Sequence, residues 1–137
     1  MLKNLMLVPI SVSDQDRALA FYTDSLGLEK GIDNPTPEGR FLTVAPADKS
    51  VQILLWPGNP GQPGPAVDAA EPGSLAGAIF LEADDLRKEF GVLRSRGVEF
   101  VQPEPEDYAF GVRVTVLDPD GNRIELRQPK PSRRSDS

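Results

Sequence analysis

The fold is decided by residues 12–22, Val-Ser-Asp-Gln-Asp-Arg-Ala-Leu-Ala-Phe-Tyr, in which Asp14 opens a stretch with apolar residues at helical spacing. An apolar, strand-like run at residues 5–12 leads into it. Asp85 opens a second helical stretch 71 residues later, from 14 to 85, and it also follows an apolar run, residues 76–83. A repeat at a fixed spacing indicates that one structural module occurs twice in the chain.

Each copy is predicted to fold as a strand, a helix and three further strands. The first copy has strands at 5–12, 28–32, 40–45 and 51–56, a loop at 33–39, and a helix that Gly27 ends. The second has strands at 76–83, 98–102, 109–117 and 123–127, an acidic loop at 103–107, and a helix capped by Asp84 or Asp85.

The sequence therefore predicts an α+β fold in which two βαβββ modules form one domain, residues 1–128, with curved mixed sheets enclosing a cleft. Module one spans residues 4–56 and module two spans residues 75–127. We interpret residues 57–74 as a linker, because half of them are glycine or proline. We expect residues 129–137 to form a disordered tail.

Composition excludes several kinds of chemistry. The 137 residues contain neither cysteine nor histidine, so disulfides, thiolate metal sites and the commonest general base are absent. The net charge of −6 disfavours a nucleic-acid partner and suits a cationic ligand. No run approaches the roughly 20 apolar residues of a membrane helix, and the N-terminus lacks a signal-peptide pattern, so we expect a cytoplasmic protein with no membrane partner.

Strand alternation predicts which side chains line the cleft. Ile53, Leu55, Ile124 and Leu126 should pack under the helices, which turns their neighbours towards the opposite face. On that face, or at its mouth, the expected ligand-binding residues are Leu7, Gln52, Leu54, Trp56, Phe80, Tyr108, Phe110 and Arg113, with Glu125 as the one candidate catalytic residue.

Three motifs resemble a known family. Residues 12–28, 84–100 and 118–126 are similar to signatures of the glyoxalase / bleomycin resistance / extradiol dioxygenase group, the vicinal oxygen chelate superfamily. The resemblance covers about residues 4–128. It implies the paired-module fold, a ligand site in the cleft and a homodimer.

The family's metal enzymes hold a divalent ion with four strand residues, usually His, Gln or Glu. The resemblance places these positions at Leu7, Leu54, Ala78 and Glu125. Only Glu125 has a lone pair to offer, and one carboxylate does not make a divalent site. We therefore expect no metal and no other cofactor.

Four functions remain open at this point. The leading hypothesis is metal-independent binding of a small organic molecule, cationic or aromatic, in the style of the bleomycin-resistance branch, with drug sequestration as one form. The alternatives are a metal-dependent glyoxalase-like lyase, isomerase or dioxygenase, an enzyme that uses Glu125 as a base without metal, and a non-catalytic subunit. The mostly apolar metal positions favour a protein that is not an enzyme.

Overall fold

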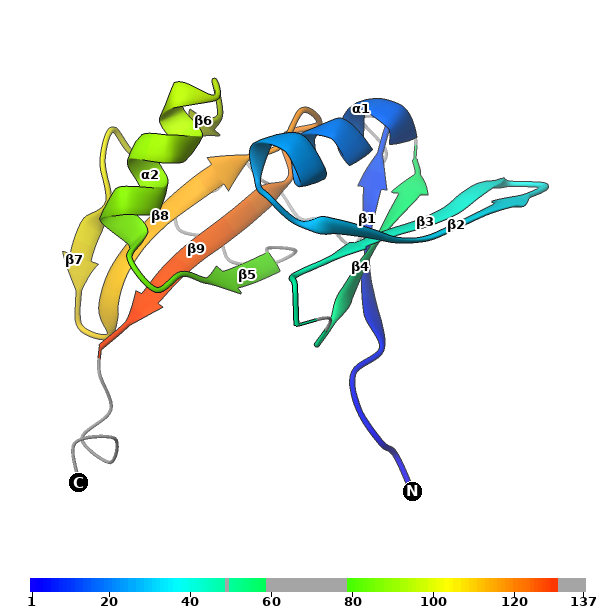
Figure 1. Ribbon diagram of the computed structural model, residues 1–137, viewed down its shortest axis with the longest axis horizontal. Helices are drawn as coiled ribbons and strands as arrows, with labels where there is room; N and C mark the ends of the chain where they lie inside the picture. The colour runs from blue at the N-terminus through cyan, green and yellow to red at the C-terminus, as the bar shows by residue number, and fades with distance from the viewer. Residues whose placement is uncertain (49, 59–78, 131–137) are drawn as a thin grey trace. The chain divides into compact units, whose positions relative to one another are not determined.

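The computed structural model describes residues 1–48, 50–58 and 79–130 (Figure 1). The chain divides into two compact units, Met1–Val67 and Asp68–Ser137. Each unit contains one mixed sheet and one main helix, so the predicted α+β class is confirmed. The expectation of a single domain with a shared cleft stays a prediction.

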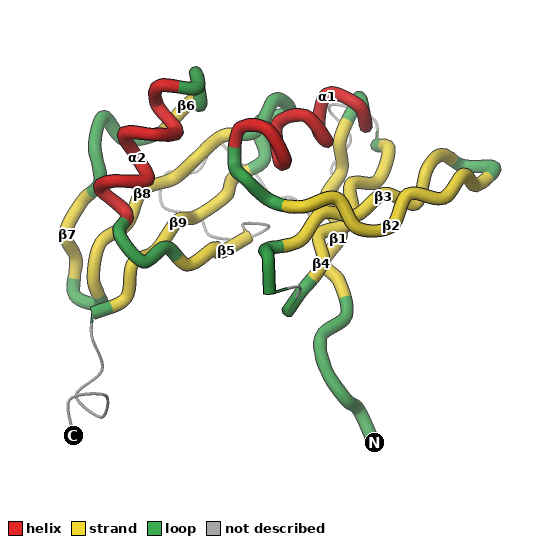
Figure 2. Tube along the Cα trace, in the orientation of Figure 1, coloured by secondary structure: helices red, strands yellow, loops and turns green. Residues whose placement is uncertain are grey.

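Unit 1 follows the predicted order of elements. It contains β1 (Leu7–Val12), α1 (Gln15–Ala20), a π-helical continuation η1 (Phe21–Ser25), β2 (Glu29–Thr36), β3 (Gly39–Ala45) and β4 (Gln52–Pro57). The strands lie in the order β1-β4-β3-β2, with β1 parallel to β4 and the other pairs antiparallel. Figure 2 shows the helical turns of this unit on the chain between β1 and β2.

Unit 2 repeats this plan. It contains β5 (Ile79–Glu82), α2 (Leu86–Ser95), β6 (Glu99–Phe100), β7 (Glu106–Tyr108), β8 (Gly111–Leu117) and β9 (Arg123–Pro129). The order is β5-β9-β8-β6, with β7 paired to β8. As in unit 1, the first strand is parallel to the last one.

The helices begin where the sequence predicts. The Asp14 carboxylate accepts a hydrogen bond from the backbone N–H of Arg17 at 3.1 Å, and the Asp85 carboxylate accepts one from Lys88 at 3.2 Å. Each aspartate thereby satisfies a backbone donor that has no partner within its helix. Asp85, rather than Asp84, is the cap of α2.

The cores also follow the predicted alternation. α1 contacts β3 and β4, and α2 contacts β9. The strand residues predicted to lie under the helices are buried, together with the helix residues that face them: Ile53, Leu55, Tyr22 and Ala18 in unit 1, and Ile124, Leu126, Leu86 and Leu93 in unit 2. Burial of this apolar face stabilises each helix on its sheet.

The internal repeat is visible in the strand registers. Leu54 lies opposite Pro9 and Thr43, and Glu125 lies opposite Phe80 and Thr115. Leu54 and Glu125 therefore occupy equivalent positions in the two sheets, as the 71-residue spacing requires.

Two predicted loops are partly strands. β2 continues through Thr36, so most of the stretch expected as a loop pairs with β3, and Arg40 there donates to Asp33 through both Nε and Nη2 at 3.0 and 2.8 Å. β2 is the last strand of its sheet, where Pro35 needs to donate no hydrogen bond on the open side. Likewise, residues 106–108 of the expected acidic loop form β7.

Other boundaries shift by a few residues. β1 begins at Leu7 rather than at residue 5, and β6 is confined to Glu99–Phe100. β9 ends at Pro129, the first residue of the expected tail. The rest of that tail beyond Lys130, and nearly all of the expected linker, lie outside the described residues. Among the residues described, no helix is long and apolar enough to cross a membrane.

Candidate functional site

The sheet of unit 1 carries four of the predicted ligand residues on the side away from α1. Leu7 lies opposite Gln52, and alternation along β4 places Leu54 and Trp56 on the same side. We call this side the Gln52 face. Leu54 is buried, whereas Leu7, Gln52 and Trp56 are half-buried.

A hydrogen-bond chain fixes Gln52. The backbone N–H of Ile32 donates to Thr43 Oγ1 at 2.8 Å, and Thr43 Oγ1 donates to Gln52 Oε1 at 2.6 Å. Gly31 makes this approach possible, because a Cβ there would stand 2.6 Å from Thr43 Oγ1 and 2.9 Å from Gln52 Oε1. Gln52 therefore presents its amide N–H₂ as the donor group that is not used within the described part of unit 1.

The corresponding side of the unit 2 sheet centres on Glu125, and we call it the Glu125 face. The Glu125 carboxylate is buried, yet both oxygens are used: Oε2 accepts from Thr115 Oγ1 at 2.8 Å, and Oε1 accepts from Arg127 Nη2 at 2.7 Å. Gln102 extends the chain, since its Oε1 accepts from the Thr115 backbone N–H at 2.7 Å and its Nε2 donates to Thr115 Oγ1 at 3.2 Å. A buried charge with such partners is well satisfied.

An arginine–aromatic cluster, made of Phe80, Tyr108, Arg113 and Arg127, lies on the same face. The Cζ atom of Arg127 is 4.9 Å from the centre of the Phe80 ring and 5.2 Å from that of Tyr108. The Cζ atom of Arg113 is 4.9 Å from the Tyr108 ring. At these distances a guanidinium is attracted by the negative face of an aromatic ring. Phe110 packs edge-on against Tyr108, with ring centres 5.8 Å apart.

The structure thus brings together the predicted unit 2 residues Phe80, Tyr108, Phe110, Arg113 and Glu125. Arg127, Thr115 and Gln102 are not among the predicted site residues, although they make the contacts that hold Glu125. Alternation from Glu125 points to Arg127, and antiparallel pairing with β9 points to Thr115. Nothing in the sequence marks Gln102, because its contact depends on where β6 ends.

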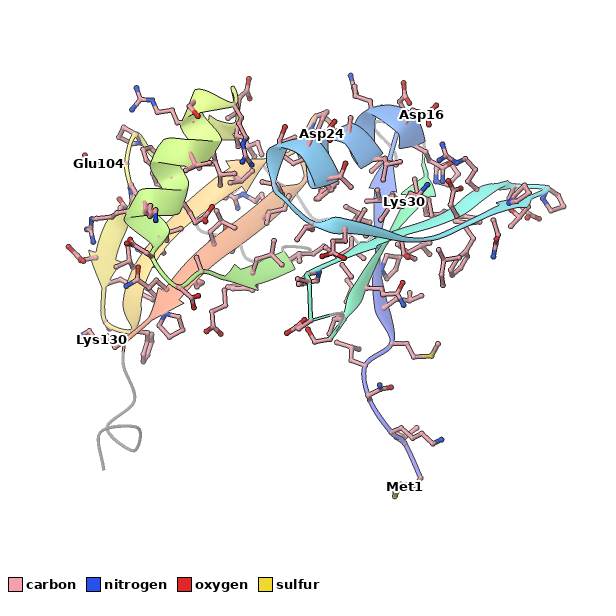
Figure 3. All side chains as sticks on the ribbon, in the orientation of Figure 1. Met1, Asp16, Asp24, Lys30, Glu104 and Lys130 are labelled. Carbon is pink, nitrogen blue, oxygen red and sulfur yellow. The ribbon has the colours of Figure 1, made fainter. Side chains whose placement is uncertain are left out.

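A network of ion pairs around Arg40, near the start of α1, has a different role from the two faces. Arg40 reaches Asp33 on β2 and also Asp16, which Figure 3 labels on α1. The hydrogen bonds from Arg40 lower the pKa of Asp33, and the two carboxylates raise the pKa of Arg40. Because each charge has its partner within unit 1, this network is structural.

The four positions at which the family's metal enzymes bind their ion do not fit a metal here. Leu7 and Leu54 are hydrocarbons, and Ala78, an alanine in the sequence, lies outside the described residues. Glu125 has the right chemistry, but its oxygens already accept from Thr115 and Arg127, and Arg127 is a cation. Within the described part of the chain, no three acidic residues gather in a cluster that could hold an ion. The donor set does not support metal chemistry at these positions.

Comparison with known proteins settles the family. Residues 4–126 match the model of the Glyoxalase/Bleomycin resistance protein/Dioxygenase superfamily, and the chain belongs to that superfamily. The predicted resemblance is therefore confirmed over nearly all of the region for which it was stated.

Three relatives illustrate the range within this superfamily. TnmS3, an antibiotic binding protein from Streptomyces sp. CB03234, is 29% identical, with a TM-score of 0.77 over 94% of this chain and 98% of its own. YetH of Bacillus subtilis (strain 168), an uncharacterized protein, is 29% identical over 93% of this chain and 100% of its own. A probable lactoylglutathione lyase of Synechocystis sp. (strain ATCC 27184 / PCC 6803 / Kazusa) is 29% identical over 90% of this chain and 94% of its own.

Proposed function

We propose that this protein binds a small aromatic molecule without a transition metal and does not transform it. The observation that carries the proposal is the state of Glu125. The one carboxylate left at the family's metal positions is held by a hydroxyl and a guanidinium, and those partners leave it poorly placed to ligate an ion.

The surroundings of Glu125 suit binding rather than catalysis. Aromatic and apolar side chains supply contact area, and a few fixed polar groups supply orientation, as in most small-molecule sites. The proposed ligand-binding residues are Leu7, Gln52, Leu54 and Trp56 on the Gln52 face, and Phe80, Tyr108, Phe110 and Arg113 on the Glu125 face. The similarity to TnmS3, an antibiotic binding protein, supports this class of function, with drug sequestration as one form of it.

A ligand screen with chelator present tests the proposal. Trp56 is the single tryptophan, so its fluorescence reports binding on the Gln52 face. We expect a saturable change with at least one planar aromatic compound, equal affinity with and without chelator, and recovery of the compound unchanged by mass spectrometry. Conversion of the compound, or binding that chelator abolishes, would contradict the proposal.

A matched pair of variants locates the binding surface. Phe80 and Val92 are both exposed apolar residues, but only Phe80 lies on the Glu125 face. Phe80→Ala should weaken binding about tenfold, as expected for an aromatic contact residue, while Val92→Ala should leave it unchanged. Equal effects of the two substitutions would place the ligand elsewhere.

A second candidate function is a glyoxalase-like lyase or isomerase, or a dioxygenase, that uses a metal or Glu125 as a base. It is favoured by the similarity to the probable lactoylglutathione lyase of Synechocystis and by the carboxylate at position 125. This function requires turnover that Glu125→Gln abolishes. Turnover that also disappears with chelator identifies the metal form, and turnover that persists with chelator identifies the base form.

A further inference from the structure

The arginine–aromatic cluster places two positive charges side by side. Arg113 and Arg127 lie directly opposite each other on β8 and β9, and both guanidiniums lie against the Tyr108 ring. Like charges directly opposite on paired strands destabilise a sheet. Glu106 and Glu125 each pair with one of these arginines, and an anionic ligand would further offset the repulsion between the two cations.

The carboxylates of this face do not occupy all the hydrogen-bond donors of the two arginines. Glu125 accepts one hydrogen bond from Arg127 Nη2, whereas Arg127 Nε is buried and has no hydrogen-bond partner among the described residues. Glu106 lies 3.6 Å from Arg113, and both side chains are nearly half exposed, so water screens this pair. Glu82 lies beside Arg127 in register, but the described residues give no ion pair between them. An unsatisfied buried donor costs free energy that an acceptor from a ligand would recover.

The aromatic members of the cluster supply a flat surface next to these donors. Half of Phe80 is exposed although its ring packs against Arg127, so part of the ring is free for a second planar group. The guanidinium between Phe80 and Tyr108 is held in one orientation by its contacts with both rings and with Glu125. A preorganised arginine loses less entropy when it binds an oxygen anion than a mobile one does.

We infer that the cluster recognises a planar aromatic molecule that carries an acidic oxygen, a carboxylate or a phenolate. The aromatic ring stacks on Phe80, and the oxygen accepts from Arg127 and Arg113. This inference rests on the proposed function and names its ligand class. It also replaces the cationic ligand suggested by the net charge of −6, because the charged groups found over the aromatic rings of the cluster are Arg113 and Arg127.

The test uses three probes of the same shape and different charge: 2-naphthoate, 2-naphthamide and protonated 2-naphthylmethylamine. Their affinities for the full chain are measured by isothermal titration calorimetry at pH 7 and low salt. We expect the naphthoate to bind about tenfold more tightly than the amide, because its acceptor is an anion that pairs with the arginines whereas the amide oxygen is uncharged, and the amine to bind most weakly.

Arg113→Gln and Arg87→Gln provide the matched variants. Both arginines are about half exposed and each has one carboxylate partner, but Arg87 pairs with Asp107 outside the cluster. Arg113→Gln should weaken naphthoate binding about tenfold and leave amide binding unchanged, while Arg87→Gln should affect neither. Arg127→Lys keeps the charge beside Glu125 but loses the planar stack, so it should reduce the affinity for both probes.

The outcomes separate the inference from the proposed function. If all three probes bind with equal affinity, if the amine binds best, or if Arg87→Gln matches Arg113→Gln, the inference is wrong and the binding function stands. If none of the three probes binds, the proposal of an aromatic ligand is overturned together with the inference.

Discussion

The contacts of Glu125 narrow the roles that this residue can have. In the sequence it is the one residue at the family's four metal positions that can serve as metal ligand, base or ion-pair partner. In the structure its side chain is 6% exposed and the Arg127 side chain 15% exposed, with Nη2 and Oε1 2.7 Å apart. A pair this well shielded is costly to break, since removal of one member leaves the other charge without compensation.

Glu125→Gln should therefore destabilise the protein by about 3 kcal/mol, the usual cost of breaking a buried pair. The control is Glu106→Gln, whose partner Arg113 lies 3.6 Å away at the surface, and which should change stability by about 0.5 kcal/mol or less. Urea unfolding of the two variants measures both values. Equal losses would show that Glu125 and Arg127 are not the coupled pair described here.

Residue-level contacts also mark what could be predicted from the sequence. Alternation along the strands places Glu125, Phe80 and Arg113 correctly on one face. The stack of Arg127 between Phe80 and Tyr108 could not be derived in this way, because Tyr108 belongs to β7, a strand of three residues inside a stretch that reads as an acidic loop. The sequence thus predicts which side chains share this face of the sheet but not the contacts between them.

At the scale of the elements, the largest difference between the predicted and the observed structure is in β2. Pro35, Pro37 and Gly39 make residues 33–39 read as a loop, since proline and glycine are typical of turns. The strand nevertheless continues to Thr36, because β3 supplies backbone hydrogen-bond partners and the Arg40 guanidinium donates two hydrogen bonds to the Asp33 carboxylate. Tertiary pairing outweighs local propensity at the edge of a sheet.

The Arg40–Asp33 contact should make this hairpin sensitive to acid. The folded-state pKa of Asp33 is lowered from its usual value of 3.8, first by the hydrogen bonds from Arg40. A lowered pKa contributes stability that is present above the unfolded value and is lost as pH falls through the folded one. Wild type should therefore be more stable than Asp33→Asn at pH 6, and the difference should shrink below about pH 4. Thermal melts of both proteins across this pH range measure the difference in stability. A difference that does not depend on pH would show that the Asp33 carboxylate is not stabilised by Arg40.

Two glycines should respond in opposite directions to the same substitution. Gly31→Ala places a methyl group 2.6 Å from Thr43 Oγ1 and disturbs the bond to Gln52, which we expect to cost about 1–3 kcal/mol. Gly91 lies in α2, where a Cβ meets nothing within 4 Å, so Gly91→Ala should stabilise the protein by about 0.5–1 kcal/mol. Denaturant unfolding tests both, and a neutral Gly31→Ala would show that Thr43 and Gln52 can yield without loss.

At the scale of the whole molecule, the internal repeat sets the fold and gives the two sheets matching positions. Two equivalent sheets place Leu54 and Glu125 at matching positions, each opposite a threonine of the neighbouring strand. One copy has a hydrocarbon there, and the other has a carboxylate that is already paired with Arg127. The superfamily hosts many chemistries, so membership fixes the architecture, while these side chains decide what the site can do.

Thermal stability of the tag-free protein tests the central claim most directly, first with chelator and then with Mn, Fe(II), Co, Ni, Zn and Mg ions in turn. An ion that binds only the folded state at a hundredfold excess over its dissociation constant adds about 2.7 kcal/mol of stability, which raises the melting temperature clearly. We predict no rise with any of these ions. A clear rise with one metal that is lost in Glu125→Gln would contradict metal-independent binding and make the enzyme the better account of this protein.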